Sequence, residues 1–260
     1  MKIKTLMPFL SIVFLGVFLL GTLGSCGDDT KKPIEQGPLP TVTCYNVKES
    51  KTLIFDKGVL VDSALFKFTF DAQNRITNQW SIKDDLVLDF DYSDAKKITM
   101  NQRAKTTGRL VYYTHYILNQ KGYASWKNMY ASDSAFLTSI SYLYNKEGYR
   151  TQEYYHAGRD SSLGYYGVWQ NECITQFSIP QYETQVVATY TNYPDNRNMG
   201  YWQFLRDKSY YLVDTEKYST RGSSTTYRYT YQFDSLNRPT IITMYQGTIK
   251  LQDARFGSVY

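Results

Sequence analysis

The amino-acid sequence predicts an all-β protein, a large antiparallel meander of repeated hairpins that curls into a barrel or half-barrel. Apolar and polar side chains alternate over residues 66–70 (FKFTF) and 227–233 (YRYTYQF), which is typical of strands with one buried and one wetter face. Tyrosine, a residue that favours strands, accounts for 26 of the 260 residues. One turn motif recurs along the chain, and we expect no helix of any length beyond residue 42.

The N-terminal segment has the features of a signal peptide that is removed on export. Lys2 and Lys4 precede an apolar stretch at residues 6–23, and two small residues then stand before Cys26. Residues 23–26 (LGSC) resemble the lipobox of bacterial lipoproteins, in which the cysteine sulfur receives a diacylglycerol and the freed amine a further acyl chain. The alternative is an uncleaved membrane anchor, since about 18 apolar residues are just long enough to span a bilayer. The small residues and the cysteine favour the lipoprotein.

The chain is therefore expected to have three parts: a signal peptide (1–25), a lipidated N-terminus with a flexible tether (26–41), and a single antiparallel β domain (42–260). The tether is polar and holds three of the seven prolines. Asp28 and Asp29 resemble the acidic export signal that sends Bacteroidota lipoproteins to the outer face of the outer membrane. We expect the acylated cysteine to hold the protein in the lipid bilayer of the outer membrane, facing the cell exterior, with the periplasmic face as the alternative.

A recurring turn motif connects the expected strands. It reads aromatic or Leu, then Asp or Asn, two free positions, and Gly or Asn before the next strand. Residues 70–77 (FDAQNRIT), 144–151 (YNKEGYRT) and 233–240 (FDSLNRPT) are close copies, while 118–125 and 92–99 are looser ones. Asp or Asn at the first turn position accepts hydrogen bonds from backbone amides ahead of it, and Gly or Asn supplies the left-handed residue of a bulge. These acidic residues are therefore expected to form turns rather than to catalyse a reaction or bind calcium.

The charge and the cysteine content narrow the classes of function. The chain carries a net charge of +5, and removal of the leader with its two lysines lowers this to +3. A net charge this small favours neither nucleic acid nor an acidic polymer as a partner. Cys44 and Cys173 form a candidate disulfide in an oxidising compartment, and the sequence leaves their pairing open. The sequence has no C-x-x-C spacing and only two histidines, His115 and His156, so we expect no metal site and no cofactor.

Residues 158–205 interrupt the repeated pattern. Within them, residues 193–202 (YPDNRNMGYW) predict a loop or short helical turn rather than a strand. Segments that interrupt a repeated scaffold often carry function, and aromatic rings can stack on sugar rings. The alternative is that these side chains fill the interior of the sheet or close one end of the barrel. The candidate ligand-binding aromatics are Tyr165, Tyr166, Trp169, Tyr193, Tyr201 and Trp202.

Two stretches of the C-terminal half resemble a known family. Residues 189–200 (TYTNYPDNRNMG) and 227–245 (YRYTYQFDSLNRPTIITMY) are similar to Bacteroidota lipoproteins grouped as domain of unknown function 4595, which have a porin-like β fold. The resemblance covers most of residues 45–250 and is strongest at 186–245. It implies a large antiparallel sheet curled into a barrel or half-barrel, and it brings no established activity and no catalytic residues. The hairpin motif also resembles the YD repeats of large secreted shell proteins.

Three hypotheses for the function follow from these features. The first is a non-enzymatic binding or scaffold protein with a glycan or protein ligand, because aromatic residues are abundant and catalytic motifs are absent. The alternative is a polysaccharide-acting hydrolase, which needs two carboxylates roughly 5–10 Å apart. Acidic residues are plentiful, but the sequence contains no G-x-S-x-G, H-E-x-x-H or P-loop motif. The second alternative is a transmembrane β-barrel, but most expected strands carry polar residues on both faces, which favours a soluble barrel.

Overall fold

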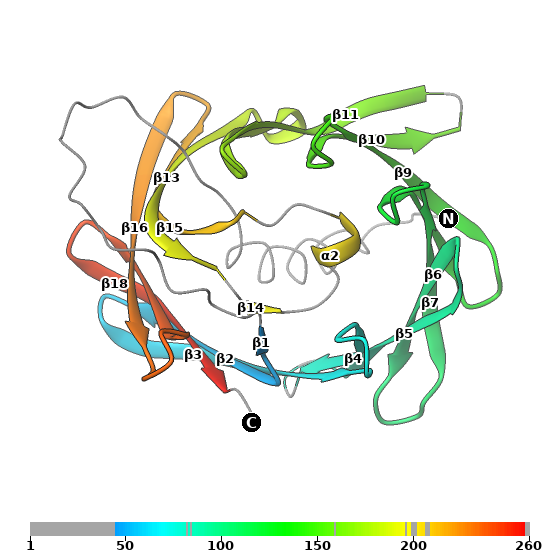
Figure 1. Cartoon of the computed structure of the whole chain (residues 1–260), viewed down its shortest axis with the longest axis horizontal. Helices are drawn as coiled ribbons and strands as arrows, with labels where there is room; N and C mark the ends of the chain where they lie inside the picture. Colours follow the sequence, from blue (N-terminus) through cyan, green and yellow to red (C-terminus); the bar gives the residue numbers. More distant parts are fainter. Residues whose placement is uncertain are drawn as a thin grey trace, which may run out of the picture.

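The computed structural model describes residues 45–81, 83, 85–158, 160–195, 197–198, 202–205 and 209–257. Sixteen antiparallel strands form a closed barrel in which the strands follow one another around the ring in chain order (Figure 1). The barrel strands are β2 (Glu49–Asp56), β3 (Val59–Phe70), β4 (Ile76–Ser81), β5 (Leu86–Asp94), β6 (Lys97–Ala104), β7 (Leu110–Leu118), β8 (Ala124–Ala131), β9 (Phe136–Tyr144), β10 (Arg150–Ala157), β11 (Asp160–Gln170), β12 (Cys173–Ile179), β13 (Thr184–Pro194), β15 (Tyr211–Thr220), β16 (Ser223–Phe233), β17 (Pro239–Gln246) and β18 (Ile249–Gly257).

The first and last strands of the ring close the barrel. β18 pairs antiparallel with β2 in a register that aligns Gly257 with Glu49 and Arg255 with Lys51. Every strand of the ring therefore has a hydrogen-bonded neighbour on both sides, so the described ring has no edge strand exposed to another chain. The predicted antiparallel meander is confirmed, and it closes as a barrel rather than a half-barrel.

The recurring motif forms the predicted hairpin turns. The Asp71 carboxylate accepts hydrogen bonds from the backbone N–H groups of Gln73 and Arg75 (3.0 and 2.9 Å). Asn74 has a left-handed φ of 59°, and Gly148 takes the same position in the turn after β9 with a φ of 89°. The motif turns connect β3 to β4, β5 to β6, β7 to β8, β9 to β10 and β16 to β17, so they all lie at one end of the barrel. We call this the turn end; β2 begins and β18 ends there as well.

Two short elements between β13 and β15 lie inside the ring (Figure 1). They are β14 (Arg197–Asn198), which pairs in parallel with β1 (Tyr45–Asn46), and the single turn of α2 (Trp202–Leu205). A further short helix, η1 (Pro180–Tyr182), connects β12 to β13. No helix in the described chain has the length and apolar character needed to cross a membrane. α2 begins at the end of the segment for which a loop or short helical turn was expected, and it lies inside the ring.

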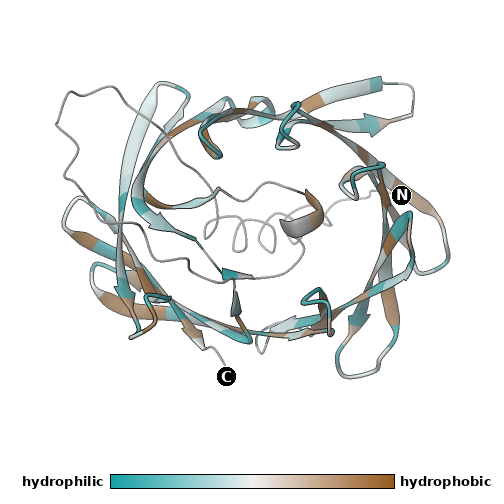
Figure 2. Cartoon of the chain, in the orientation of Figure 1, coloured by the Kyte–Doolittle hydropathy of each residue, from teal (hydrophilic) through white to brown (hydrophobic). Residues whose placement is uncertain are grey.

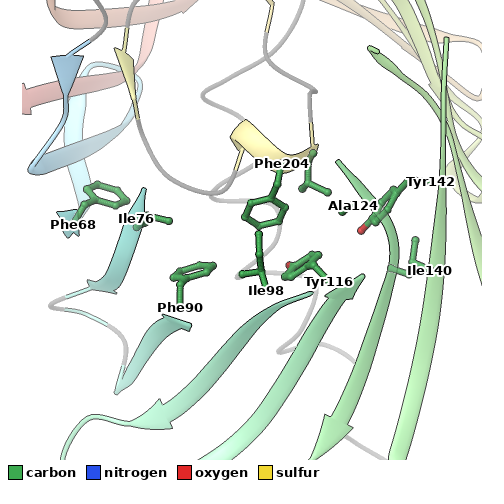
Figure 3. Packing of buried hydrophobic residues seen from close by; sticks show 10 residues of the cluster. Phe68, Ile76, Phe90, Ile98, Tyr116, Ala124, Ile140, Tyr142 and Phe204 are labelled. Carbon is green, nitrogen blue, oxygen red and sulfur yellow. The ribbon is translucent and has the colours of Figure 1, made fainter. Parts of the chain in front are cut away.

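The hydrophobic core lies inside the ring of strands. Phe204 and Leu205 of α2 are each only 6% exposed, and they pack against the inner faces of β3 to β9 (Figure 3). The ring of Phe204 lies 4.8 Å from that of Tyr116 on β7, measured between centroids. Two further clusters cover the inner faces of β11 to β13 and of β16 to β18. Figure 2 shows the brown, apolar part of α2 within the ring.

Side chains that alternate with the core residues point to the outside of the barrel. On β18, Ala254 is fully buried in the core while the adjacent Arg255 is exposed. On β16, Tyr229 is buried and the adjacent Arg228 is exposed. A membrane-spanning barrel has the opposite arrangement, with apolar side chains outside and polar side chains inside. The fold therefore places its apolar core where a porin has a water-filled channel.

Candidate functional site

The outer faces of β7 to β11 form a surface without formal charge. Lys127 on β8 points inward, because it is buried and its register partner Tyr116 packs on α2. Side chains alternate along a strand, so the neighbouring Trp126 and Asn128 point outward. We call this surface the uncharged wall. Its outward side chains are Tyr113, His115 and Ile117 on β7, Trp126, Asn128 and Tyr130 on β8, Phe136, Ser139, Ser141 and Leu143 on β9, Gln152, Tyr154 and His156 on β10, and Tyr166 on β11.

Outward charges lie on other parts of the barrel. Arg103 on β6 and Asp89 on β5 form an ion pair of 3.4 Å on the outer face. Lys51 on β2 and Arg255 on β18 are paired in register, and Lys217 on β15 is also exposed. The lack of charge is therefore a property of five neighbouring strands and not of the whole outer surface.

Three aromatic rings form one stacking surface on the uncharged wall. The rings of Tyr113 and Tyr130 are 4.9 Å apart and nearly parallel, at 12°. They face each other in register across β7 and β8, which is the arrangement in which aromatic pairs stabilise a sheet. Phe136 on β9 meets Tyr130 edge-on at 5.7 Å and is 56% exposed. We call Tyr113, Tyr130 and Phe136 the tyrosine platform.

A second stacking surface lies further along β8. The rings of Trp126 and His156 are 4.8 Å apart at an angle of 37°, and Trp126 is 41% exposed. The His156 Nε2 lies 2.8 Å from the Ser141 hydroxyl, which fixes the imidazole against the indole. Leu143 and Tyr166, which are 49% and 40% exposed, are both register partners of Gln152 and extend this surface across β9 to β11. We call Trp126 and His156 the tryptophan platform.

Neutral hydrogen-bonding groups lie between the two platforms. Asn128 is the register partner of His115 on β7 and of Ser139 on β9. The Ser139 hydroxyl donates to the Asn128 carbonyl oxygen at 2.7 Å. Burial lowers the pKa of His115, and the positive charge of Lys97 lowers it further, so the imidazole is neutral at pH 7. The middle of the uncharged wall therefore holds partly exposed amide and neutral imidazole groups, with Ser139, only 7% exposed, beneath Asn128.

Comparison with known proteins shows the fold. No family model and no curated protein matches the sequence. A porin-like protein from Bacteroides uniformis has a similar structure, with a TM-score of 0.60 at 14% identity over 84% of this chain and 100% of the other. A porin-like protein from Bacteroides vulgatus gives 0.53 at 13% identity over 83% and 99%. The chain has a porin-like fold. Membership of the domain of unknown function 4595 family stays a prediction from the sequence.

The porin-like barrel places the candidate aromatics of β11 in different environments. Tyr166 lies on the uncharged wall, whereas the adjacent Tyr165 points inward and is only 8% exposed. Trp169 stacks on Tyr149 at 4.5 Å, and its indole N–H donates to the backbone carbonyl of Arg150 at 2.7 Å. One of these three candidates is therefore on the surface that we describe as the site.

The candidates near α2 are separated from that surface. Tyr193 is exposed, and its ring lies 4.9 Å from that of Phe233 near the turn end of the porin-like barrel. Tyr201 and the side chain of Trp202 lie outside the described residues. The described candidates therefore do not share one face. The sequence interpretation also overlooked Trp126 and the tyrosine platform, although residues 110–118 and 124–131 lack charges at every outward position.

Acidic groups inside the porin-like barrel form internal contacts. The hydroxyls of Tyr229 and Tyr218 donate to the Glu216 carboxylate at 2.6 and 3.2 Å, and burial raises the pKa of Glu216 to about 7. Glu153 forms a buried ion pair of 2.9 Å with Arg150. Among the described residues, no group of three or more His, Cys, Asp and Glu is placed to hold a metal ion. Both carboxylates thus have polar partners within the barrel.

Several sequence predictions concern residues outside the described chain. The signal peptide, the tether and the acylated Cys26 are among them. Cys173 is buried at the start of β12, and Cys44 is outside the described residues, so their disulfide stays a prediction.

Proposed function

We propose that this protein is a cell-surface lipoprotein of the outer membrane that binds a glycan through the uncharged wall and catalyses no reaction. The uncharged wall is the observation that carries the proposal. Its aromatic residues Trp126, Phe136 and Tyr166 are exposed although the core of the barrel lies on the other face of the same strands. An exposed apolar surface of this kind commonly marks an interaction site, because folding alone gives no reason to keep it in water.

A glycan fits the wall better than a protein does. The core of a protein interface is a continuous apolar patch, whereas the rings here alternate with polar groups such as Asn128, Ser139 and Ser141. Aromatic rings offer flat faces on which the C–H face of a sugar ring can stack. Amide and hydroxyl groups both donate and accept, so they can bind the hydroxyls around that ring.

The charges elsewhere on the barrel favour a position in water beside the bilayer. Arg228 points outward from the middle of β16, and Lys51 and Arg255 point outward nearer the turn end. A Lys or Arg that faces lipid at the bilayer midplane costs about 2–4 kcal/mol. In this proposal the acyl chains on Cys26 hold the protein at the membrane, and the barrel itself does not span it.

Replacement of Trp126 by Ala tests this function. We expect the full-length protein in detergent, fluorescently labelled, to bind spots of a printed polysaccharide array, and Trp126→Ala to lose that signal. Trp80→Ala is the matched control, because Trp80 is also outward but lies beneath the ammonium groups of Lys67 and Lys105 at 5.4 and 4.4 Å. This control should bind like the wild type. Equal signals from Trp126→Ala and the wild type would exclude the wall, and a wild type that binds no polysaccharide would exclude the glycan.

A further inference from the structure

The two platforms of the uncharged wall are held at a fixed separation. Trp126 and Tyr130 lie four residues apart on β8 and on the same face. At about 3.3 Å per residue along a strand, their Cα atoms are about 13 Å apart. β8 pairs with β7 on one side and β9 on the other, so this separation is rigid. Both platforms can act on one ligand only if that ligand is long enough to reach from one to the other.

The polar groups between the platforms fit the middle of such a ligand. Asn128 lies between Trp126 and Tyr130 on β8, with His115 and Ser139 beside it on the neighbouring strands. A ligand that stacks on both rings must cross these groups. Because they donate and accept hydrogen bonds without formal charge, they suit a chain of sugar hydroxyls.

The absence of formal charge on the wall also limits the charge of its ligand. A carboxylate or sulfate on a glycan loses its water when it binds, and the wall has no Lys or Arg among its own outward side chains to replace that water. Lys97 on β6, in register with Ile117 of the wall, is paired with Asp94 at 4.0 Å. We infer that the uncharged wall binds a neutral polysaccharide in an extended conformation, with one chain running along β8 from the tryptophan platform to the tyrosine platform. This inference rests on the proposed function, since it specifies the ligand of the same surface.

Isothermal titration calorimetry with oligosaccharides of increasing length tests the inference. The probes are neutral β-linked gluco- and manno-oligosaccharides from disaccharide to octasaccharide, with oligogalacturonates of the same lengths as the charged comparison. We expect the affinity of the wild type for a neutral series to rise about tenfold or more at the length that reaches both platforms. Trp126→Ala and Tyr130→Ala should each abolish that rise. Trp80→Ala, Trp126→Phe and Tyr130→Phe should keep it, because the first is off the wall and the others retain a ring.

The outcomes separate this inference from the proposed function. A rise that persists in both Ala variants, or no rise with length, overturns the bridging of the platforms; if Trp126→Ala still weakens binding, the proposed function stands. Equal or tighter binding of the oligogalacturonates overturns the neutral ligand. A wild type that binds neither series overturns both. Matching thermal unfolding of the wild type and the Ala variants shows that the barrel is intact.

Discussion

Glu216 is a carboxylic acid that faces the apolar interior of the barrel, and its protonation couples the fold to pH. Burial raises its pKa to about 7, and the hydrogen bonds from Tyr229 and Tyr218 only partly offset this rise. The folded protein therefore holds the proton up to about pH 7, whereas the unfolded chain releases it near the ordinary value of 4.5. Between these two values the folded state binds more protons than the unfolded state.

We expect the Glu216→Gln variant to lose part of the pH dependence of stability. Because unfolding releases the Glu216 proton between pH 4.5 and about 7, the free energy of unfolding falls as pH rises through that window and is level above it. The shift corresponds to about 3 kcal/mol. Gln carries no titrating proton, so urea denaturation across the window should show a shallower decline in the variant. The Glu49→Gln variant, at a side chain that is 46% exposed, is the control and should decline like the wild type. An unchanged slope in Glu216→Gln contradicts the prediction.

The backbone conformation of a turn residue could be predicted from the sequence, whereas the face of the sheet on which an aromatic residue lies could not. Asn74 and Gly148 could be predicted as left-handed turn residues because the turn depends on a few neighbouring residues. The face on which an aromatic lies depends instead on the rest of the sheet. Tyr112 and Tyr113 are adjacent, and only the pairing with β8 shows that the second is on the outer face. Tyr165 and Tyr166 presented the same ambiguity, and the two candidate aromatics lie on opposite faces of β11.

Among the elements, α2 departs furthest from the repeated hairpins, and its packing links the two sides of the interior. Its residues Phe204 and Leu205 join the core of β3 to β9, while Ser209, just after it, lies 2.7 Å from the hydroxyl of Tyr190 on β13. A single helical turn has little stability of its own, so its position comes from this packing. Phe204 and Leu205 of α2 are thus part of the core.

We expect Phe204→Ala to lower the stability of the barrel substantially. Phe204 is 6% exposed and lies 4.8 Å from Tyr116, and replacement of a buried Phe by Ala typically costs about 3–5 kcal/mol. Phe136→Ala is the matched control, because Phe136 is 56% exposed on the outer face. Chemical denaturation should show a loss of well under 1 kcal/mol for this control. A similarly small loss in Phe204→Ala would mean that α2 is not packed into the core.

The position of α2 could not be predicted from the sequence. The sequence predicted a loop or short helical turn at residues 193–202, because a proline and a run of polar residues interrupt the strand pattern there. Its burial depends on contacts with β3 to β9, which are distant in sequence. Local patterns do not encode such contacts, so a loop over the end of the barrel and a segment inside it look alike in the sequence.

On the scale of the whole molecule, the barrel has its two faces exchanged relative to a membrane porin. The repeated hairpins predicted an antiparallel meander, and closure was left open because it depends on the pairing of β2 with β18, almost the whole chain apart. The interior clusters and α2 place apolar side chains inside the ring, beside buried polar groups such as Glu216, and charges such as Arg228 and Arg255 face outward. A barrel of this polarity needs a separate means of attachment if it is to stay at a membrane.

Cys26 is the expected means of attachment, and palmitate labelling tests it. Residues 23–26 match the lipobox pattern, and two or three acyl chains anchor a protein stably at about 0.8 kcal/mol per buried CH₂. We expect cells fed labelled palmitate to incorporate it into the wild type and not into Cys26→Ala, because the sulfur that accepts the lipid is absent. Ser25→Ala is the control, since it keeps a small residue before the cysteine and should still be labelled. Label on Cys26→Ala would show that the lipid is attached elsewhere and would contradict this prediction.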